Sequence, residues 1–299
     1  VGSVGDLAAD AAATGGVGHQ DAVAARERQI GGQRRALVAA LFLDDLDQHD
    51  LPDLDHFLNL VLARARLAGV ADLFGHILVG DGSNARVVHL GQWDNTAIHA
   101  ATHTAHVGRD AHLDHILVSL SGAIQRVNPS FLLDGNGSGV EALGVYFADR
   151  GRHVEHRVFV HHIAPQSTSN VLYKGALHGE STHTVWVGDV LIGRDATGTN
   201  SYEANRNLIL SDGARADSIP NLEIETGDIE GAGHASATGR LDDEHLFYLQ
   251  ARGITEKEAR RLVALGFLLD IVGRVGDAAL EEDLTERFTA ALDSVEETR

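Results

Sequence analysis

The sequence predicts a mainly β protein with a β-solenoid body and a C-terminal α-helical tail. From about Gly75 the chain consists of short runs of alternating polar and apolar residues bounded by Gly, Asp and Asn, which is the pattern of β-strands. A turn followed by an apolar strand recurs through this region, and after Thr238 the apolar period becomes that of a helix. A β-sandwich would show the same alternation, but the recurring turns favour a solenoid.

Residues 1–72 differ in character from the rest of the chain and are expected to be a divergent or poorly ordered segment, in part helical. A small-residue opening is followed by a basic patch at Arg26–Arg35 and then by an alternation of Asp and Leu with histidines. Helical periodicity occurs near Phe57–Leu67, although caps are poor. Two interpretations stay open: a genuinely divergent N-terminus, or an out-of-frame reading of GC-rich coding sequence.

Residues 73–240 form the predicted β body. Its strand segments include HILVG, HILVSLSG, VYFAD, HRVFVHH and VWVGDVLIG. The turn that separates them recurs at intervals of about 27 to 42 residues, loosely within the range of repeat architectures. The turns are predicted at Asp81, Asp110, Gly137, Gly179 and Gly213.

Residues 241–299 form the predicted helical tail. Asp242 can cap a helix that ends near Gly253, a residue suited to the C′ position. Thr255 and Glu258 match a capping box for a second helix. That helix is expected to place one broad apolar face on the body, made of Ala259, Leu262, Val263, Gly266, Phe267 and Leu269. A third helix from Asp277 towards Val295 carries Leu280, Leu284, Phe288 and Leu292 at a spacing of four residues.

The composition narrows the chemistry. Twenty-four Lys and Arg against 43 Asp and Glu give a net charge of −19, which disfavours binding to nucleic acid and to anionic membranes. The chain has no cysteine, so thiolate chemistry is excluded and the 18 histidines are the strongest transition-metal ligands available. No apolar run has the length of a membrane helix, and a cytoplasmic location is expected.

A series of short motifs resembles the closing segment of the SufB/SufD family. They are Pro220, Leu222 and Ile224; His234; Asp242 and Asp243; Phe247, Tyr248 and Leu249; Arg252, Gly253 and Ile254; and Glu258, Ala259 and Arg260. Upstream, Arg126, Asn128 and Pro129, then Tyr173, Lys174 and Gly175, and then Asn205 to Leu208 also match. The resemblance covers about Leu90 to Val272.

The resemblance implies a right-handed parallel β-helix with helical ends, which serves as a scaffold for building iron–sulfur clusters. It implies pairing with a homologous SufB-like subunit through the last strands, as a heterodimer, and docking of a SufC-type ATPase on the C-terminal helices. The turn Gly233-His234-Ala235 has no flanking carboxylates, which matches SufD-like rather than SufB-like members. The cysteine often found just before this histidine in SufD relatives is Ala232 here.

His234 is therefore the one candidate ligand for iron or a cluster, at the interface with the partner. A single imidazole cannot hold a cluster, so a transient cluster would be shared with the partner, and no cofactor is expected to bind stably to this chain alone. The alternative is a turn histidine that bonds to backbone. The resemblance also implies an ATPase docking region, which comprises Phe247, Tyr248, Arg252, Gly253, Lys257, Arg260 and Arg261.

Other motifs are expected to be structural. On a strand, His156 and His162 share one face and His153 and His161 the other, and His103 and His106 lie on opposite faces. The glycine-rich run 135–139 is expected to be a turn.

The predicted function is that of a non-catalytic scaffold subunit of a SufB–SufC–SufD type complex. A β-helix polysaccharide lyase or hydrolase and a histidine-rich metal-binding module are the alternatives. The sequence leaves open whether the chain pairs with itself, which cluster type forms, and whether iron enters through this subunit.

Overall fold

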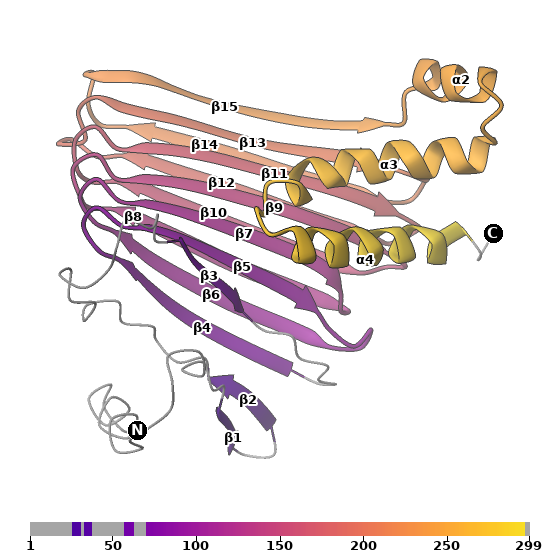
Figure 1. Cartoon of the computed structure of the whole chain (residues 1–299), viewed down its shortest axis with the longest axis horizontal. Coiled ribbons are helices and arrows are strands. Elements are labelled where there is room, and N and C mark those ends of the chain that lie inside the picture. The colour runs from indigo at the N-terminus through magenta and orange to yellow at the C-terminus, as the bar shows by residue number, and fades with distance from the viewer. Residues whose placement is uncertain (1–25, 31–32, 38–56, 63–69, 297–299) are drawn as a thin grey trace.

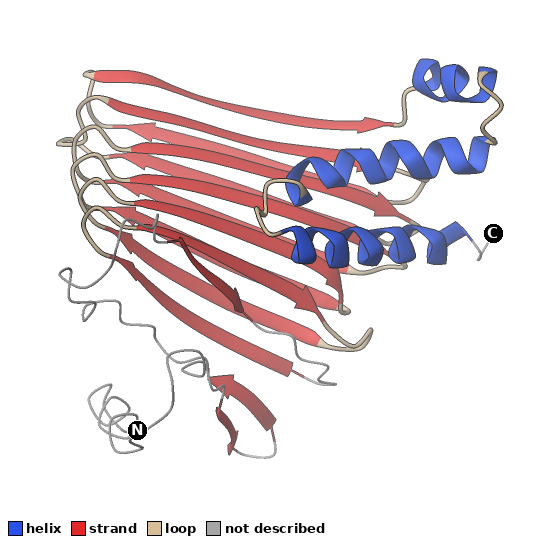
Figure 2. Ribbon diagram, viewed as in Figure 1, coloured by secondary structure: helices blue, strands red, loops and turns tan. Residues whose placement is uncertain are grey.

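The computed structural model describes residues 26–30, 33–37, 57–62 and 70–296. Figure 1 shows stacked layers of long strands, with helices lying across one layer and a further helix beyond the end of the last strand. Strands dominate the described chain (Figure 2). The mainly β solenoid with a helical tail that the sequence predicts is confirmed, and the parallel pairing excludes the β-sandwich.

The solenoid is built from two parallel sheets that the chain visits in turn. In the described residues one sheet has six strands in the order β14-β12-β10-β8-β6-β4, and the other has seven in the order β15-β13-β11-β9-β7-β5-β3. The bounds of the strands are β3 Phe57–Leu62, β4 Val70–Val79, β5 Asn84–Gln92, β6 Ile98–Val107, β7 His112–Ser121, β8 Ile124–Leu133, β9 Gly139–Asp149, β10 His153–His162, β11 Thr168–His178, β12 His183–Ile192, β13 Thr199–Ile209, β14 Arg215–Ile224 and β15 Ile229–Arg240.

Successive turns of the solenoid stack almost in register. The ion pair from Arg86 to Asp114 joins side chains 28 residues apart, and the hydroxyls of Ser169 and Ser201 meet at 2.8 Å across 32 residues. The repeat is therefore one full turn of two strands. Its length varies from turn to turn, which explains the irregular spacing seen in the sequence.

The predicted turn positions all lie between strands. Gly137, Gly179 and Gly213 have positive φ, and so has Asp110 at 52°. Asp81 precedes Gly82, which also has positive φ, and its carboxylate accepts a hydrogen bond from the Arg109 amide in the next turn. Left-handed residues thus turn the chain at these corners, and the corners stack on one another.

Two apolar clusters hold the molecule together. The first fills the lumen, by which we mean the space between the two sheets, with side chains such as Val127, Phe131 and Trp186. The second lies between the outer face of the seven-stranded sheet and the helices, and contains Phe147, Leu268 and Phe288. The strands of this sheet are therefore apolar on both faces, while the strands of the six-stranded sheet alternate more strictly.

The helices begin where the sequence predicts. Helix α2 spans Asp243–Ala251 with Asp242 as its N-cap, α3 spans Glu256–Val272 with Thr255 as its N-cap, and α4 spans Ala278–Glu296. The Thr255 hydroxyl accepts a hydrogen bond from the Glu258 amide, but the Glu258 carboxylate accepts one from Arg261. Only one of the two hydrogen bonds of the expected capping box therefore forms between these residues.

The buried face of α3 differs from the predicted one. The side chains buried on the sheet are Ala259, Ala264, Leu268, Ile271 and Val272, whereas Leu262 is 38% exposed and Gly266 is exposed. The apolar residues of this helix surround much of its circumference, so the sequence alone could not select the stripe that packs. On α4 the predicted residues Leu284, Phe288 and Leu292 are buried, whereas Leu280 is only partly buried and Val295 is buried as well.

The N-terminal region departs from the prediction where it is described. Residues Phe57–Leu62 form strand β3, paired in parallel with β5, and not a helix. Strands β1 (Arg26–Ile30) and β2 (Gln33–Leu37) form an antiparallel pair in the segment that was expected to be divergent or poorly ordered and in part helical. The alternating segment FLNLVL can follow either period, and an available strand edge selects the β conformation. The rest of the predicted divergent segment lies outside the described residues.

No helix within the described residues has the length and apolarity needed to cross a bilayer.

Candidate functional site: the open end of the solenoid and the helical tail

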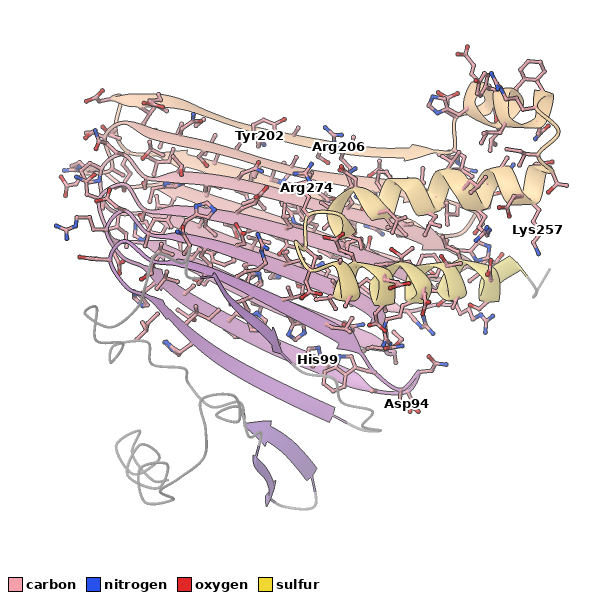
Figure 3. All side chains as sticks on the ribbon, viewed as in Figure 1. Asp94, His99, Tyr202, Arg206, Lys257 and Arg274 are labelled. Carbon is pink, nitrogen blue, oxygen red and sulfur yellow. The ribbon has the colours of Figure 1, made fainter. Side chains whose placement is uncertain are left out.

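The last turn of the solenoid leaves one edge of each sheet uncovered. Strand β14 pairs with β12, and β15 pairs with β13; among the described residues neither has a neighbour on its other side. Large apolar side chains are exposed near this end, with Tyr202 46%, Ile219 48% and Ile224 44% accessible. Figure 3 shows Tyr202 and Arg206 on β13, close to the terminal strand β15. Such an edge can accept further strands from another chain.

His234 lies within this terminal strand and is exposed, so the turn that the sequence analysis expected at Gly233-His234-Ala235 is wrong. It stands in register with Glu203 of β13, whose side chain points into the lumen. Residues in register in a parallel sheet project on the same side, so His234 faces the lumen at its open end. Ala232, two residues earlier on the same face, packs against the lumen core. A cysteine side chain at that position would share the face of His234.

Glu203 is a functional candidate that the sequence analysis missed. Its side chain is 1% exposed, and neither carboxylate oxygen has a hydrogen-bond partner among the described residues. Burial, and to a lesser extent the charge of Asp189, raises the pKa of Glu203 to about 8. A sequence signal existed: Glu203 occupies an inward position of a strand, between Ser201 and Asn205.

A chain of polar side chains runs through the lumen towards the same open end. The Tyr146 hydroxyl donates to the Asn207 side-chain oxygen at 2.6 Å and accepts from Asn205 at 3.1 Å. Asn207 also donates to Asn205 at 2.6 Å and to the Thr238 hydroxyl at 3.4 Å. Thr238 lies on β15, so these bonds tie the terminal strand to turns deeper in the solenoid.

The predicted docking region starts on α2, which carries two exposed aromatic side chains. Phe247 is 73% and Tyr248 56% exposed, and the Arg252 guanidinium lies over the Tyr248 ring, 4.9 Å from its centroid. Gly253, with φ of +88°, reverses the chain into α3. Exposed aromatic residues beside an arginine are typical of the centre of a protein interface.

The basic residues of α3 differ in how many acidic side chains they bind. The Arg260 side chain donates to Glu256 at 2.9 Å on an exposed face. Arg261 binds Glu258 in a bidentate manner and lies 3.8 Å from Asp293 of α4. Arg261 therefore helps to hold α3 to α4. Lys257 lies at the start of α3, near α2 (Figure 3).

The structure does not bring His234 and the docking region together. The strand from His234 to Arg240 is extended and leads away to α2, which at about 3.3 Å per residue is roughly 20 Å. The two predicted sites are thus separate surfaces at one end of the molecule.

Histidines gather inside the first described turns, which the sequence analysis did not foresee. His89, His99, His103 and His115 are at most 1% exposed, and His103 Nδ1 lies 2.9 Å from His115 Nε2. Burial lowers the pKa of each, and neighbouring imidazoles lower those of His89, His99 and His115 further; the pKa values of His99 and His103 fall to about 4. They come from three strands, so only the stacking of turns reveals the cluster. In the part of the chain that is described, no group of three or more side chains is arranged to hold a metal ion.

The other motif predictions are confirmed. His156 and His162 point into the lumen, and His153 and His161 point away from it. His103 is buried while His106 is outside, where it pairs with Asp134 at 2.7 Å. The glycine-rich run is a turn at Asn136 and Gly137 followed by the start of β9.

Comparisons with known proteins agree on one family. Residues 63–267 match the family model described as SUF system FeS cluster assembly, SufBD core domain. Over 227 residues the chain is 50% identical to a Mycobacterium tuberculosis protein named iron–sulfur cluster assembly SufBD family protein, covering 74% of this chain and 57% of that protein. A Mycobacterium leprae protein of the same name is 50% identical over 222 residues, covering 70% of this chain and 57% of its own length.

The Escherichia coli iron–sulfur cluster assembly protein SufD is 25% identical over 243 residues, covering 71% of this chain and 57% of that protein. The chain thus spans a little over half the length of the curated relatives it matches.

Proposed function

Because this chain belongs to the SufBD family of iron–sulfur cluster assembly proteins, we propose that it is a SufD-like scaffold subunit of a SufB–SufC–SufD type complex. Its proposed role is to position other subunits and a growing cluster, and not to catalyse a reaction itself. The observation that carries the proposal is the uncovered last turn of the solenoid, where His234 projects on the lumen side between two unpaired strand edges.

The proposed partner at this edge is a homologous SufB-like subunit. The exposed backbone of β14 and β15 can continue each sheet into a second solenoid. Tyr202, Ile219 and Ile224 would be buried by that contact. A second copy of this chain could use the same edge, and the two arrangements differ in what they bring to His234.

In the proposed complex His234 lends one imidazole nitrogen to iron or to a cluster, which is cargo and not a resident cofactor. Neutral imidazole is a good ligand for iron. The remaining ligands would come from the partner, since Gly233 and Ala235 flank the histidine on β15.

The proposed ATPase of the SufC type docks on the outer surface of α2 and the start of α3. Phe247, Tyr248 and Arg252 would form the centre of that contact, and Lys257 and Arg260 would border it. Arg261 is proposed as a support that holds α3 against α4. The complex is proposed to work in the cytoplasm.

The test is purification of the tagged chain from native lysate, with identification of the proteins that accompany it. The proposal expects a larger homologue and an ATPase to co-purify. Phe247→Asp with Tyr248→Asp should remove the ATPase and keep the homologue, because α2 lies apart from the solenoid edge. Ile98→Asp is the matched control, since Ile98 is 40% exposed but lies at the opposite end. Recovery of neither partner with the wild-type chain would refute the proposal.

A further inference from the structure

We propose that Glu203 and His234 together form a two-donor half-site for a divalent iron ion on the lumen side of the last two turns, which ligands from the partner subunit complete. The inference rests on the proposed function, since it takes His234 to face a partner. It adds a second ligand from this chain, supplied by β13, the strand that pairs with the one carrying the histidine.

The register of the sheet puts the two side chains next to each other. Glu203 on β13 is paired with His234 on β15, and neighbouring strands lie about 4.8 Å apart. Both side chains project on the lumen side, and no strand beyond β15 covers them within the described residues. A carboxylate and an imidazole on adjacent strands can reach one ion.

The burial of Glu203 needs an explanation that packing does not supply. The residue in register with Glu203 one turn earlier is Val171 on β11, so an apolar side chain fits at this place in the stack of strands. A buried carboxyl without partners costs about 1–3 kcal/mol or more, and both oxygens of Glu203 are without one among the described residues. A residue so placed is a candidate for a ligand that the structure does not contain.

The opposite sheet leaves room for the carboxyl group. A Cβ at Gly188 of β12 would overlap a carboxylate oxygen of Glu203 and the ring of Trp186. Two more buried polar atoms on this side have no partner among the described residues: the Trp186 indole nitrogen and the hydroxyl of Ser218, which is in register with it. This end of the lumen therefore holds several polar groups without hydrogen-bond partners among the described residues, as expected of a ligand site.

The donor set fits divalent iron. Carboxylate and imidazole are both good ligands for Fe²⁺, and two donors leave several positions open for the partner. The residues that flank His234 on β15 have no carboxylate, and Glu203 supplies one from the preceding turn of the solenoid. Since no group of three donors occurs in the described chain, the site is incomplete without the partner.

The test is anaerobic titration of Co²⁺, as a spectroscopic probe for Fe²⁺, into the full chain co-purified with its partner. The visible absorption of bound Co²⁺ reports affinity and ligand environment. Glu203→Gln and His234→Ala should each weaken binding by about tenfold or more, the loss typical of a disturbed metal site. Glu223→Gln, which changes the same charge on the outward side of β14, should bind as the wild type does.

The outcomes separate this inference from the proposed function. Wild-type affinity in Glu203→Gln with weakened binding in His234→Ala overturns the half-site and leaves the ligand role of His234 standing. Wild-type affinity in His234→Ala overturns both. Absence of Co²⁺ binding by the wild-type complex overturns the half-site, while co-purification still decides the partners.

A second variant guards against a folding defect. Glu203→Asp keeps the charge and withdraws the carboxylate by one methylene. It is expected to bind Co²⁺ more weakly than wild type with an altered absorption spectrum. An unchanged affinity and spectrum in Glu203→Asp would overturn the proposal, and circular dichroism on each variant checks that the solenoid is intact.

Discussion

At the scale of single residues, the lumen is fitted by tyrosines that lie on glycines of the neighbouring strand. The Tyr146 ring occupies the space where Gly175 would carry a Cβ, and the Tyr173 ring does the same at Gly144. These pairs are reciprocal, because Tyr146 and Gly175 are in register, as are Gly144 and Tyr173. Each glycine is required by its neighbour's ring and not by its own backbone angles.

Gly175→Ala should therefore destabilise the protein by about 1–3 kcal/mol, since the new methyl group overpacks against a rigid ring. Urea denaturation gives the free energy of unfolding. The control is Gly266→Ala on the exposed side of α3, where a Cβ meets nothing; it should stabilise the protein by about 0.5–1 kcal/mol, because Ala favours the helix. Equal effects of the two substitutions would contradict this account.

The buried histidines predict how stability depends on pH. Burial lowers the pKa of His156 to about 3 and that of His162 to about 4, as it lowers those of the four clustered histidines. These groups stay neutral in the folded chain but take up protons in the unfolded chain below about pH 6.5. The unfolded state then binds more protons, so acid favours unfolding.

The free energy of unfolding should accordingly be greatest above pH 6.5 and fall steeply between pH 6.5 and about 4. Replacing one histidine of the cluster, as in His89→Leu, removes one proton from the difference in proton binding between the unfolded and folded states. The free energy of unfolding should then fall less steeply with decreasing pH. Urea titrations at several pH values measure both. A free energy of unfolding that stays constant from pH 7 to pH 5 would show that the cluster is hydrated and not buried.

At the scale of elements, α3 is fastened to the seven-stranded sheet by a buried lysine as well as by apolar contacts. Lys174 of β11 points outwards, its side chain is 8% exposed, and its Nζ lies 2.6 Å from Asp270 of α3. The Lys174 ammonium also lies 4.9 Å from the centre of the Phe267 ring. Hydrogen bonding from Lys174 is the main cause that lowers the pKa of Asp270.

Asp270→Asn should destabilise the protein by about 1–2 kcal/mol, between the values of surface pairs and of fully buried ones, because Lys174 is left nearly buried without a counter-charge. The wild-type contribution is present above about pH 4 and is lost as the pH falls through the lowered pKa of Asp270. Thermal unfolding measures the loss. Asp212→Asn, which breaks the exposed pair with Arg240, serves as the control and should change little.

Local signals predicted most of these elements. The caps at Asp242 and Thr255 act within a few residues, so their positions follow from the sequence alone. The buried stripe of α3 and the strand at Phe57–Leu62 were predicted wrongly, because the surface that each segment meets decides between alternatives that its own residues leave equal. The sequence did not predict Glu203 or the histidine cluster for a related reason. The residues that surround them in space are about one full solenoid turn away in sequence.

At the scale of the whole molecule, the outer face of the seven-stranded sheet is covered and, among the described residues, the terminal edge of the solenoid is not. The helices cover the flank of the seven-stranded sheet (Figure 1), yet the terminal edge keeps exposed apolar groups. Natural proteins usually protect such edges against uncontrolled pairing. An edge left open is best explained by a partner that occupies it.

Ile224→Lys should abolish that pairing, because it places a charge at the lumen-facing rim of the last turn, where Ile224 is 44% exposed. Sedimentation velocity of the purified complex should then show the mass of the unpaired chain. Ile98→Lys, at a similarly exposed isoleucine far from the edge, should leave the complex assembled. An intact complex with Lys at 224 would move the partner to another surface.

The in-register stacking of turns also bears on how the protein is made. Each strand pairs with the counterpart one turn before it, so a nascent chain leaving the ribosome can lay every new turn on a finished one. Growth in this direction completes the residues around His234 only when synthesis of the stack is nearly over. Under the proposed function, a chain released before that point would be a folded stack that lacks the strand edge for the partner.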